Sequence, residues 1–271
     1  MDALIAQYTD ADEHSRLTRQ YITQLEYDTT MHLLSDYLGK GKNVCELGAA
    51  TGRYSLKFAS QGCNVTAVEL VPDQVRMLRE NALKQGLVLD IHEGNACHVP
   101  FIEDESQDLC VILGPLYHLK TAHERQQAIR EAKRVLKPGG VLALAYISKF
   151  FVAGLFAQRF PHLITPEVLG ELHSKGTVST QEADSFFNVG YFASPAEMES
   201  LVKGAGFLVT AHAATDGFNR YLDQGVNRFT TTQYQSWLTY HLATCQEPSL
   251  LGASNHGLVI ANNSLSFSKS T

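Results

Sequence analysis

The chain has 271 residues, 44% of them hydrophobic, and a formal net charge of −6, which fits one large globular domain or one domain with a lid. The acidic balance argues against binding to nucleic acid or to an anionic membrane, because both require a basic surface. The sequence has neither a run of about 18 apolar residues nor a basic segment followed by an apolar one, so we expect no membrane span and no signal peptide.

The five cysteines are scattered along the chain, and their odd number does not indicate a disulfide framework. Two of them, Cys45 and Cys110, fall within segments that are predicted to be buried strands. This usage is typical of a reduced, cytoplasmic protein. Neither a Cys-x-x-Cys nor a His-Glu-x-x-His pattern occurs, so we predict no metal site.

Residues 11–38 are predicted to be helical, because apolar side chains recur there near helical spacing. A break near residues 28–30 would divide this segment into two helices. We predict that residues 1–40 form a lid over the rest of the chain, in which Tyr21 and Tyr27 contact an acceptor molecule. A solvated helical face explains the same pattern equally well.

A strand, a glycine-bearing loop and a helix follow one another in the next segment. The strand is predicted at Val44–Leu47 and the loop at Gly48–Gly52, and the helix begins at Tyr54 and ends at Gly62. Glycine lets a backbone approach a ligand closely because it has no Cβ, and a helix N-terminus offers unpaired N–H groups with a partial positive charge. Residues 44–53 therefore predict a nucleotide-binding cradle, although an ordinary strand-to-helix turn has the same order.

The residues of the cradle do not fit a dinucleotide with its pyrophosphate. The Gly-x-Gly-x-x-Gly pattern of dinucleotide folds requires glycine where this chain has Ala50 and Arg53. Glu46 lies two residues before the first glycine, Gly48, and its carboxylate would repel a pyrophosphate. A carboxylate at this place suits a cofactor with a cationic head, and the ammonium of S-adenosylmethionine is such a group.

A second strand, predicted at Asn64–Glu69, ends in an acid. Glu69 follows the glycine loop at roughly the separation expected of a ribose-binding acid, and its two carboxylate oxygens can accept from both ribose hydroxyls. We therefore predict that Glu69 binds a ribose; the alternative is an acid that caps the next helix, which is predicted at Pro72–Gln85. A third strand is predicted at Leu87–His92.

The candidates for chemistry follow a fourth predicted strand, Asp108–Leu113, whose continuous apolar run fits a parallel strand with both faces covered. Functional groups gather at the carboxyl ends of strands in such sheets. Because both residues lie just beyond this end, His118 is our first candidate for a general base and Tyr117 the second. The alternative is that Tyr117 packs on the cofactor and that His118 begins a helix.

The remaining segments first continue the alternation of helices and strands and then depart from it. A helix at 123–136, a turn at 137–140 and a fifth strand at 141–147 complete a parallel sheet with right-handed crossovers. Insertions are expected at about 149–193 and about 216–250, and we expect Phe151 and Tyr191 in the first of them to contact the acceptor. The other predicted elements are a helix from Ser194 to Gly204, a strand at 207–213, a helix at 232–244 and an antiparallel last strand at 256–262, inserted at the sheet edge.

Five features in this order resemble the class I S-adenosylmethionine-dependent methyltransferases, over roughly residues 40–262. They are Glu46-x-Gly48, Glu69, Asn95 after the third strand, Asp108 before the fourth and Lys137-Pro-Gly-Gly before the fifth. The resemblance is to the small-molecule branch with an N-terminal helical segment. It implies an α/β, Rossmann-like fold: a seven-stranded, mostly parallel sheet with an antiparallel last strand, helices on both faces, and one methyltransferase domain over residues 41–271.

The resemblance also implies where the cofactor binds. In this family the turn after the third strand usually has the sequence Gly-Asp-Ala, and its acid bonds the adenine amino group. Asn95 takes that place here, and an amide can accept from the amino group and donate to a ring nitrogen. The cofactor-binding residues expected on this basis are Glu46, Gly48, Ala50, Gly52, Arg53, Glu69, Leu70, Asn95, Ala96 and Leu113.

The function implied by the resemblance is methyl transfer from S-adenosylmethionine to a small-molecule acceptor, by in-line displacement at the sulfonium methyl group. The sequence specifies neither the acceptor nor the oligomeric state. Two alternatives stay open: an S-adenosylmethionine-binding protein without transferase activity, and a nicotinamide-dependent oxidoreductase, which Ala50 and Arg53 disfavour. An RNA methyltransferase is disfavoured by the acidic balance and by Leu-Gly-Pro-Leu at 113–116, where an Asn-Pro-Pro-aromatic motif would be expected.

Overall fold

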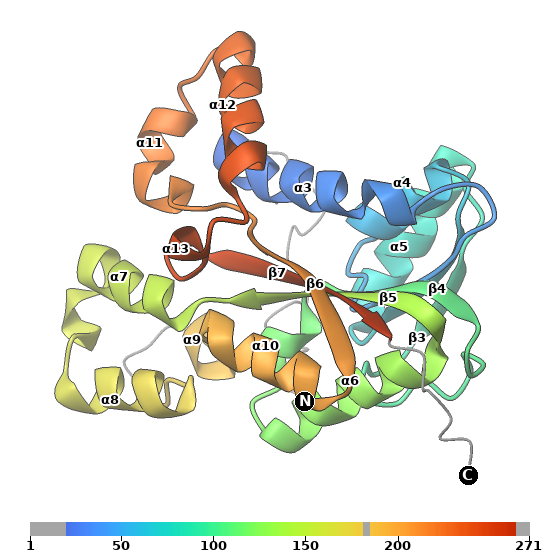
Figure 1. The fold of residues 1–271 in the computed structure, drawn as a ribbon, viewed down its shortest axis with the longest axis horizontal. Helices are drawn as coiled ribbons and strands as arrows, with labels where there is room; N and C mark the ends of the chain where they lie inside the picture. Colours follow the sequence, from blue (N-terminus) through green and yellow to red (C-terminus); the bar gives the residue numbers. More distant parts are fainter. Residues whose placement is uncertain (1–19, 181–184, 264–271) are drawn as a thin grey trace.

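One seven-stranded sheet runs through the protein, as seen in a computed structural model that describes residues 20–180 and 185–263 (Figure 1). The strand order is β3-β2-β1-β4-β5-β7-β6. The strands are β1 (Asn43–Leu47), β2 (Asn64–Glu69), β3 (Asp90–Glu93), β4 (Gln107–Ile112), β5 (Leu136–Ile147), β6 (Phe207–Ala214) and β7 (His256–Asn263). Pairs from β3 to β5 are parallel, and β7 is antiparallel to both of its neighbours, which confirms the predicted fold.

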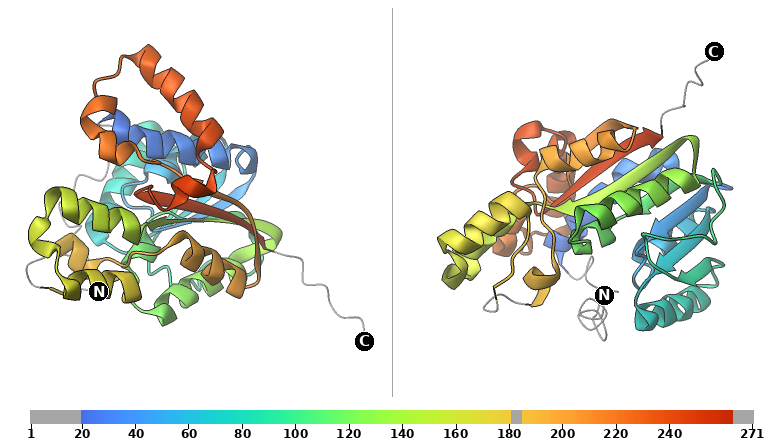
Figure 2. Two further views of the ribbon diagram at one scale, coloured as in Figure 1. Left: turned by 60° about the vertical axis from the view of Figure 1, so that its left-hand side comes forward. Right: turned by 90° about the horizontal axis from the view of Figure 1, so that it is seen from below.

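Helices cover both faces of the sheet (Figure 2). The α-helices are α3 (Tyr21–Leu34), α4 (Arg53–Ser60), α5 (Pro72–Gln85), α6 (Ala122–Val135), α7 (Lys149–Arg159), α8 (Pro166–Lys175), α9 (Ser185–Val189), α10 (Pro195–Gly204), α11 (Asp223–Val226), α12 (Thr231–Thr244) and α13 (Pro248–Leu251). The 3-10 helices are η1 (Ser35–Tyr37), η2 (Pro115–His118), η3 (Pro161–Leu163) and η4 (Asn219–Leu222). On one face α6 and α10 pack through Ile129 and Val202, and on the other α3 and α4 pack through Leu34 and Phe58.

The place of the last strand differs from the prediction. We expected it at the edge of the sheet, but β7 lies between β5 and β6, and β6 forms the edge. Burial accounts for the difference, because seven of the eight residues of β7 are buried, whereas only four of the eight residues of β6 are. A strand that is apolar on both faces is stabilised most in the interior of a sheet.

Two further predictions of local structure were wrong. No break occurs near residues 28–30: α3 is continuous, and the Thr30 hydroxyl donates to the carbonyl of Glu26 at 2.8 Å inside the helix. Lys137–Gly140 is not a turn but the start of β5, where the register against β4 shifts between Gln107 and Leu109. This irregularity absorbs the proline and the two glycines within the strand.

Helix α3 lies against the segment between β6 and β7, which contains α11 and α12 (Figure 1). The ring of Tyr21 stacks on that of Tyr234 with centroids 4.3 Å apart, and the Tyr234 hydroxyl donates to Asp28 at 2.7 Å. The predicted lid before residue 20 lies outside the described residues. No described helix is both long and apolar enough to cross a bilayer.

Candidate functional site

The loop after β1 has the shape predicted for the cradle, but its glycines are explained by packing within the protein. Gly48 and Gly52 have φ angles of 87° and 91°, a region that L side chains rarely adopt. A Cβ at Gly48 would collide with the ring of Pro115, and one at Gly52 with the side chain of Leu78. Glycine therefore lets the loops after β1 and β4 approach each other, and it lets α5 pack beneath the turn.

Glu69 is held rigidly at the end of β2. One carboxylate oxygen accepts from the backbone N–H of Ala50 and the other from that of Val71, both at 2.8 Å. The carboxylate thus links the cradle to the start of α5. Its bond to the N-cap residue of α5 is the contact expected if Glu69 caps that helix, which was our alternative to the ribose role. Each oxygen can accept a further hydrogen bond, so these contacts are compatible with the ribose role, which stays a prediction.

Glu46 lies inside the cradle with only 2% of its surface exposed. Its carboxyl accepts a short hydrogen bond from the Ser55 hydroxyl, and no ion pair with it occurs within the described parts of the chain. Burial raises the pKa of Glu46 to about 8, although the bond from Ser55 opposes the shift. A buried acid of this kind gains most when a cation binds beside it.

Arg53 and Tyr27 lie at the same end of the cradle. The guanidinium carbon of Arg53 is 4.6 Å from the centroid of the Tyr27 ring, which itself lies 5.2 Å from that of Tyr54. Two buried polar atoms here, Nε of Arg53 and the hydroxyl of Thr51, have no hydrogen-bond partner among residues 20–180 and 185–263. Buried polar atoms are usually paired in proteins, and these two are available to hydrogen-bond a polar ligand.

The two candidates for chemistry lie on η2, after β4. The Tyr117 hydroxyl donates to the carbonyl of Leu113 at 3.2 Å, so this phenol is directed back toward the cradle. Burial lowers the pKa of His118 to about 4, despite a backbone hydrogen bond with Val189. A base this weak accepts a proton poorly at neutral pH, which makes His118 a weaker candidate than its position alone indicates.

The remaining residues predicted to bind the cofactor differ in burial and in the contacts that they already make. Asn95 Oδ1 accepts from the N–H of Cys97 at 2.9 Å, and the side chain closes its own turn. Ala96 is buried in the core beside α6, and Leu70 and Leu113 are half-buried.

Of the predicted acceptor residues, only Tyr27 packs against the cradle. Tyr21 stacks on α12, and the Tyr191 ring lies under Arg125 with the guanidinium carbon 3.4 Å from its centroid. Phe151 packs against Tyr221, with ring centroids 5.1 Å apart.

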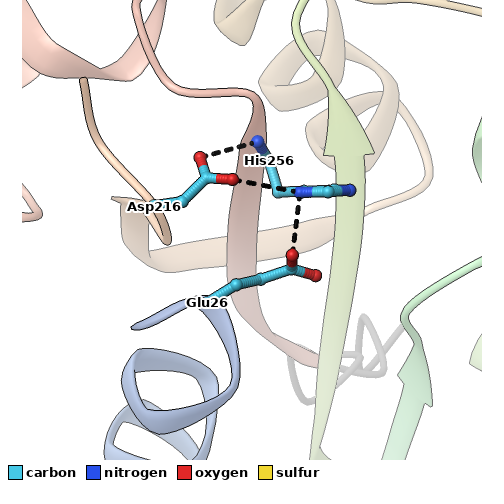
Figure 3. A group of neighbouring side chains, drawn as sticks. All are labelled: Glu26, Asp216 and His256. Carbon is cyan, nitrogen blue, oxygen red and sulfur yellow. Dashed lines mark hydrogen bonds and ion pairs between the residues drawn. The ribbon is translucent and has the colours of Figure 1, made fainter. Parts of the chain in front are cut away.

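Sequence reasoning missed a buried cluster of ionisable side chains, Glu26, Asp216 and His256 (Figure 3). These residues come from α3, from the loop after β6 and from the first position of β7. One ligand atom from each lies within 4.8 Å of the others. The separation of these residues in the sequence explains why no local pattern revealed the cluster.

Comparison with known proteins shows a resemblance over the part of the chain that contains the cradle. Residues 45–144 match the family described as "Methyltransferase domain". An uncharacterised protein of Mycobacterium tuberculosis is 32% identical over 136 residues, 50% of this chain and 47% of that protein, so the matched stretch spans about half the length of this curated relative. A ubiquinone biosynthesis O-methyltransferase of Xanthomonas euvesicatoria is 26% identical over 205 residues, 75% of this chain and 77% of the relative.

Solved structures share the fold. An S-adenosylmethionine-dependent methyltransferase of Methanosarcina mazei superposes with a TM-score of 0.60 at 20% identity, covering 86% of this chain and 97% of the other. A possible histamine N-methyltransferase of Thermotoga maritima gives 0.57 at 17% identity, with coverage of 97% and 100%. The resemblance to class I methyltransferases is thereby confirmed.

Proposed function

We propose that this chain, in which residues 45–144 are a methyltransferase domain within the class I fold, transfers a methyl group from S-adenosylmethionine to a small-molecule acceptor. The O-methyltransferase among its relatives supports the class of reaction. All five cysteines are free thiols, which supports a reducing compartment such as the cytoplasm.

The buried carboxyl of Glu46 is the observation on which the proposal depends. A pyrophosphate beside it would place like charges together in a site of low dielectric constant whenever the carboxyl is ionised, and would therefore raise its pKa further. An ammonium would instead supply the counter-charge that this group lacks and would donate to it. The amino-acid end of S-adenosylmethionine has such an ammonium.

Arg53 extends this match to the other charge of the amino-acid tail. Its guanidinium lies over Tyr27 at the end of the cradle, and its unpaired Nε is a donor suited to a carboxylate. We assign the ammonium to Glu46 and the carboxylate to Arg53. The anchored carboxylate of Glu69 is assigned to the ribose hydroxyls at the other end of the cofactor.

When bound, S-adenosylmethionine supplies a methyl group made electrophilic by the positive charge on its sulfur. The chain's part is to hold the acceptor in line with that methyl group, an effect that contributes up to about 7–11 kcal/mol in well-oriented reactions. Tyr117 lies close to the backbone that follows β4, because its hydroxyl is 3.6 Å from the position that a Cβ on Gly114 would occupy. Of the two catalytic candidates predicted from the sequence, Tyr117 and His118, the lowered pKa of His118 disfavours that residue as a general base.

Calorimetric binding of two ligands tests these assignments separately. S-adenosylhomocysteine has the whole amino-acid tail, whereas 5′-methylthioadenosine keeps the adenosine and lacks the tail. We expect Glu46→Gln and Arg53→Leu each to weaken S-adenosylhomocysteine about tenfold or more and to leave 5′-methylthioadenosine unchanged. The exposed Arg76, which pairs with Glu80 on α5, supplies the control Arg76→Gln, for which no change is expected in either ligand.

Equal losses for both ligands, or none for either, would remove the assignment of the charged tail. Micromolar binding of S-adenosylhomocysteine without turnover of methyl-labelled cofactor in a cell extract would favour a binding protein over a transferase. Fluorescence enhancement of NADH by the protein would favour an oxidoreductase.

A further inference from the structure

The imidazole of His256 is oriented by two carboxylates, as Figure 3 shows. Its Nδ1 lies 3.1 Å from a carboxylate oxygen of Glu26 and 3.3 Å from one of Asp216. The other oxygen of Asp216 accepts from the backbone N–H of His256 at 3.1 Å and from the Ser254 hydroxyl at 2.6 Å. The Asn255 side-chain nitrogen also lies 3.0 Å from this Nδ1. Because two carboxylates face Nδ1 and Nδ2 of Asn255 cannot accept, we assign the proton to Nδ1, which leaves Nε2 as the basic nitrogen.

Nε2 of His256 has no hydrogen-bond partner in the parts of the chain that the structure describes. His212 shows what a structural histidine does in the same protein: its Nδ1 bonds Glu199 at 3.0 Å and its Nε2 bonds the Tyr146 hydroxyl at 2.8 Å. Both residues are buried: 8% of the surface of His212 is exposed, and 5% of that of His256. An imidazole held on one nitrogen only resembles the oriented base of catalytic dyads more than a packing residue.

The cluster lies at the edge of the sheet where the cradle opens. His256 pairs with Ile147, the last residue of β5, so it stands at the carboxyl end of a parallel strand. Its ring centroid is 6.2 Å from that of Tyr117, whose hydroxyl bonds the carbonyl of Leu113. The adjacent Gly114 has its Cβ position 4.0 Å from the carbonyl oxygen of Gly48. One aromatic ring therefore separates His256 from the cradle.

Arg220 already occupies the position that a metal ion would take in this cluster. Its Nε lies 3.0 Å from Asp216 and its terminal nitrogen 3.2 Å from Glu26. The guanidinium bonds both acids. Burial works against the charge of Asp216, but His256 and Arg220 outweigh it and lower the pKa of that carboxyl. The arrangement is thus a complete network of one cation, two carboxylates and an imidazole, and a divalent ion would have to displace the arginine.

We propose that His256 is the general base of the transferase and that the acceptor is a hydroxyl compound, with Asp216 and Glu26 as positioning residues; this rests on the proposed function. His256 Nε2 takes the proton of the acceptor O–H while an oxygen lone pair bonds the methyl carbon. The C–S bond breaks with its electron pair passing to sulfur, and the products are the methyl ether, S-adenosylhomocysteine and a proton that His256 returns to water.

A hydroxyl is the acceptor that needs such a base. A neutral amine attacks with a lone pair that it already has, whereas a neutral hydroxyl is a weak nucleophile until its proton is removed. Burial works against a charge on His256, but Glu26 and Asp216 outweigh it and raise the pKa of the imidazole above its usual value. The titratable and charged groups facing it are Glu26, Asp216, Arg220 and Tyr117.

The ionisation of 4-nitrophenol, whose phenolate absorbs in the visible range, tests the proposal without turnover. The whole protein, saturated with S-adenosylhomocysteine, is mixed with 4-nitrophenol one pH unit below the phenol's own pKa. Free phenol is then about one-tenth ionised, and we expect more than about half of the bound phenol to be phenolate. His256→Gln should abolish this gain, His212→Gln should not, and Glu26→Gln should reduce it.

A second measurement keeps the proposal testable even where a variant does not fold. The pKa of His256 is read by NMR from its ring Cε1–H in the wild-type protein and in Glu26→Gln, in which it should fall. An equal phenolate fraction in wild type and His256→Gln, a dependence on added Mg²⁺, or an unchanged pKa in Glu26→Gln would overturn the proposal. Failure of S-adenosylhomocysteine to bind would instead refute the proposed function.

Discussion

Cofactor binding by this protein should release protons, and the number released per site follows from the environment of Glu46. Since burial raises its pKa to about 8, about nine-tenths of the empty sites hold it protonated at about pH 7. An ammonium that binds only the carboxylate then displaces about 0.9 proton per site. The apparent dissociation constant should fall about ninefold from about pH 6 to about pH 7, which corresponds to ~1.3 kcal/mol.

Calorimetry in buffers of different ionisation enthalpy measures this proton directly. S-adenosylhomocysteine is titrated into wild type, into Glu46→Gln and into the control Glu80→Gln, whose side chain is about half exposed on α5. We expect release in wild type and in the control, and neither release nor pH dependence in Glu46→Gln. Binding of the same affinity across this pH range in wild type, or equal release from Glu46→Gln, would refute the reasoning about the buried acid.

Three further predictions concern the ribose contact and the local structure. Glu69→Gln should weaken S-adenosylhomocysteine and 5′-methylthioadenosine alike by about 1–3 kcal/mol, because both contain the ribose; unchanged calorimetric affinities would remove this contact. Gly52→Ala should lower the free energy of unfolding in urea by about 1–3 kcal/mol, because the positive φ and the contact with Leu78 are both unfavourable, whereas Gly170→Ala in α8, where a Cβ meets open space, should gain up to about 1 kcal/mol. Equal urea unfolding curves for these two variants would contradict the packing explanation. Thr121→Ala removes the capping box of α6 and should cost about 1 kcal/mol in thermal unfolding; no shift would mean that Glu124 is satisfied elsewhere.

The elements specified by local chemistry could be predicted from the sequence. The bounds predicted for β2 and α5 agree with the structure residue for residue, because an alternating strand, a proline at the first turn and a terminal glycine mark them. The helix after Ser194 begins with the expected capping box, in which Ser194 accepts from the N–H of Glu197. Each of these signals lies within a few residues of the element that it defines.

The wrong predictions share a tertiary cause. Asp28–Thr30 has poor helix formers, but the helix is continuous because Thr29 and Thr30 are buried against the body of the protein. Lys137-Pro-Gly-Gly is typical of a turn, but the residues on either side of it, Leu136 and Val141, both pair with β4, so it becomes an irregularity within β5. In both places packing with a distant segment overrides the local preference.

The same distinction divides the candidate site. The cradle is contiguous in the sequence, so Glu46, Gly48 and Arg53 could be recognised there and are found together in the structure. The cluster around His256 is assembled from α3, the loop after β6 and the start of β7. Only the order of the strands, with β7 antiparallel beside β5, brings these residues to the carboxyl edge of the sheet.

The most direct test of the central claim is a crystal structure of the protein exposed to S-adenosylhomocysteine and NAD⁺ together at equal concentration. The account predicts that the cradle selects S-adenosylhomocysteine, with its ammonium against Glu46 and its ribose against Glu69. A pyrophosphate lying against Gly48–Gly52 would contradict it.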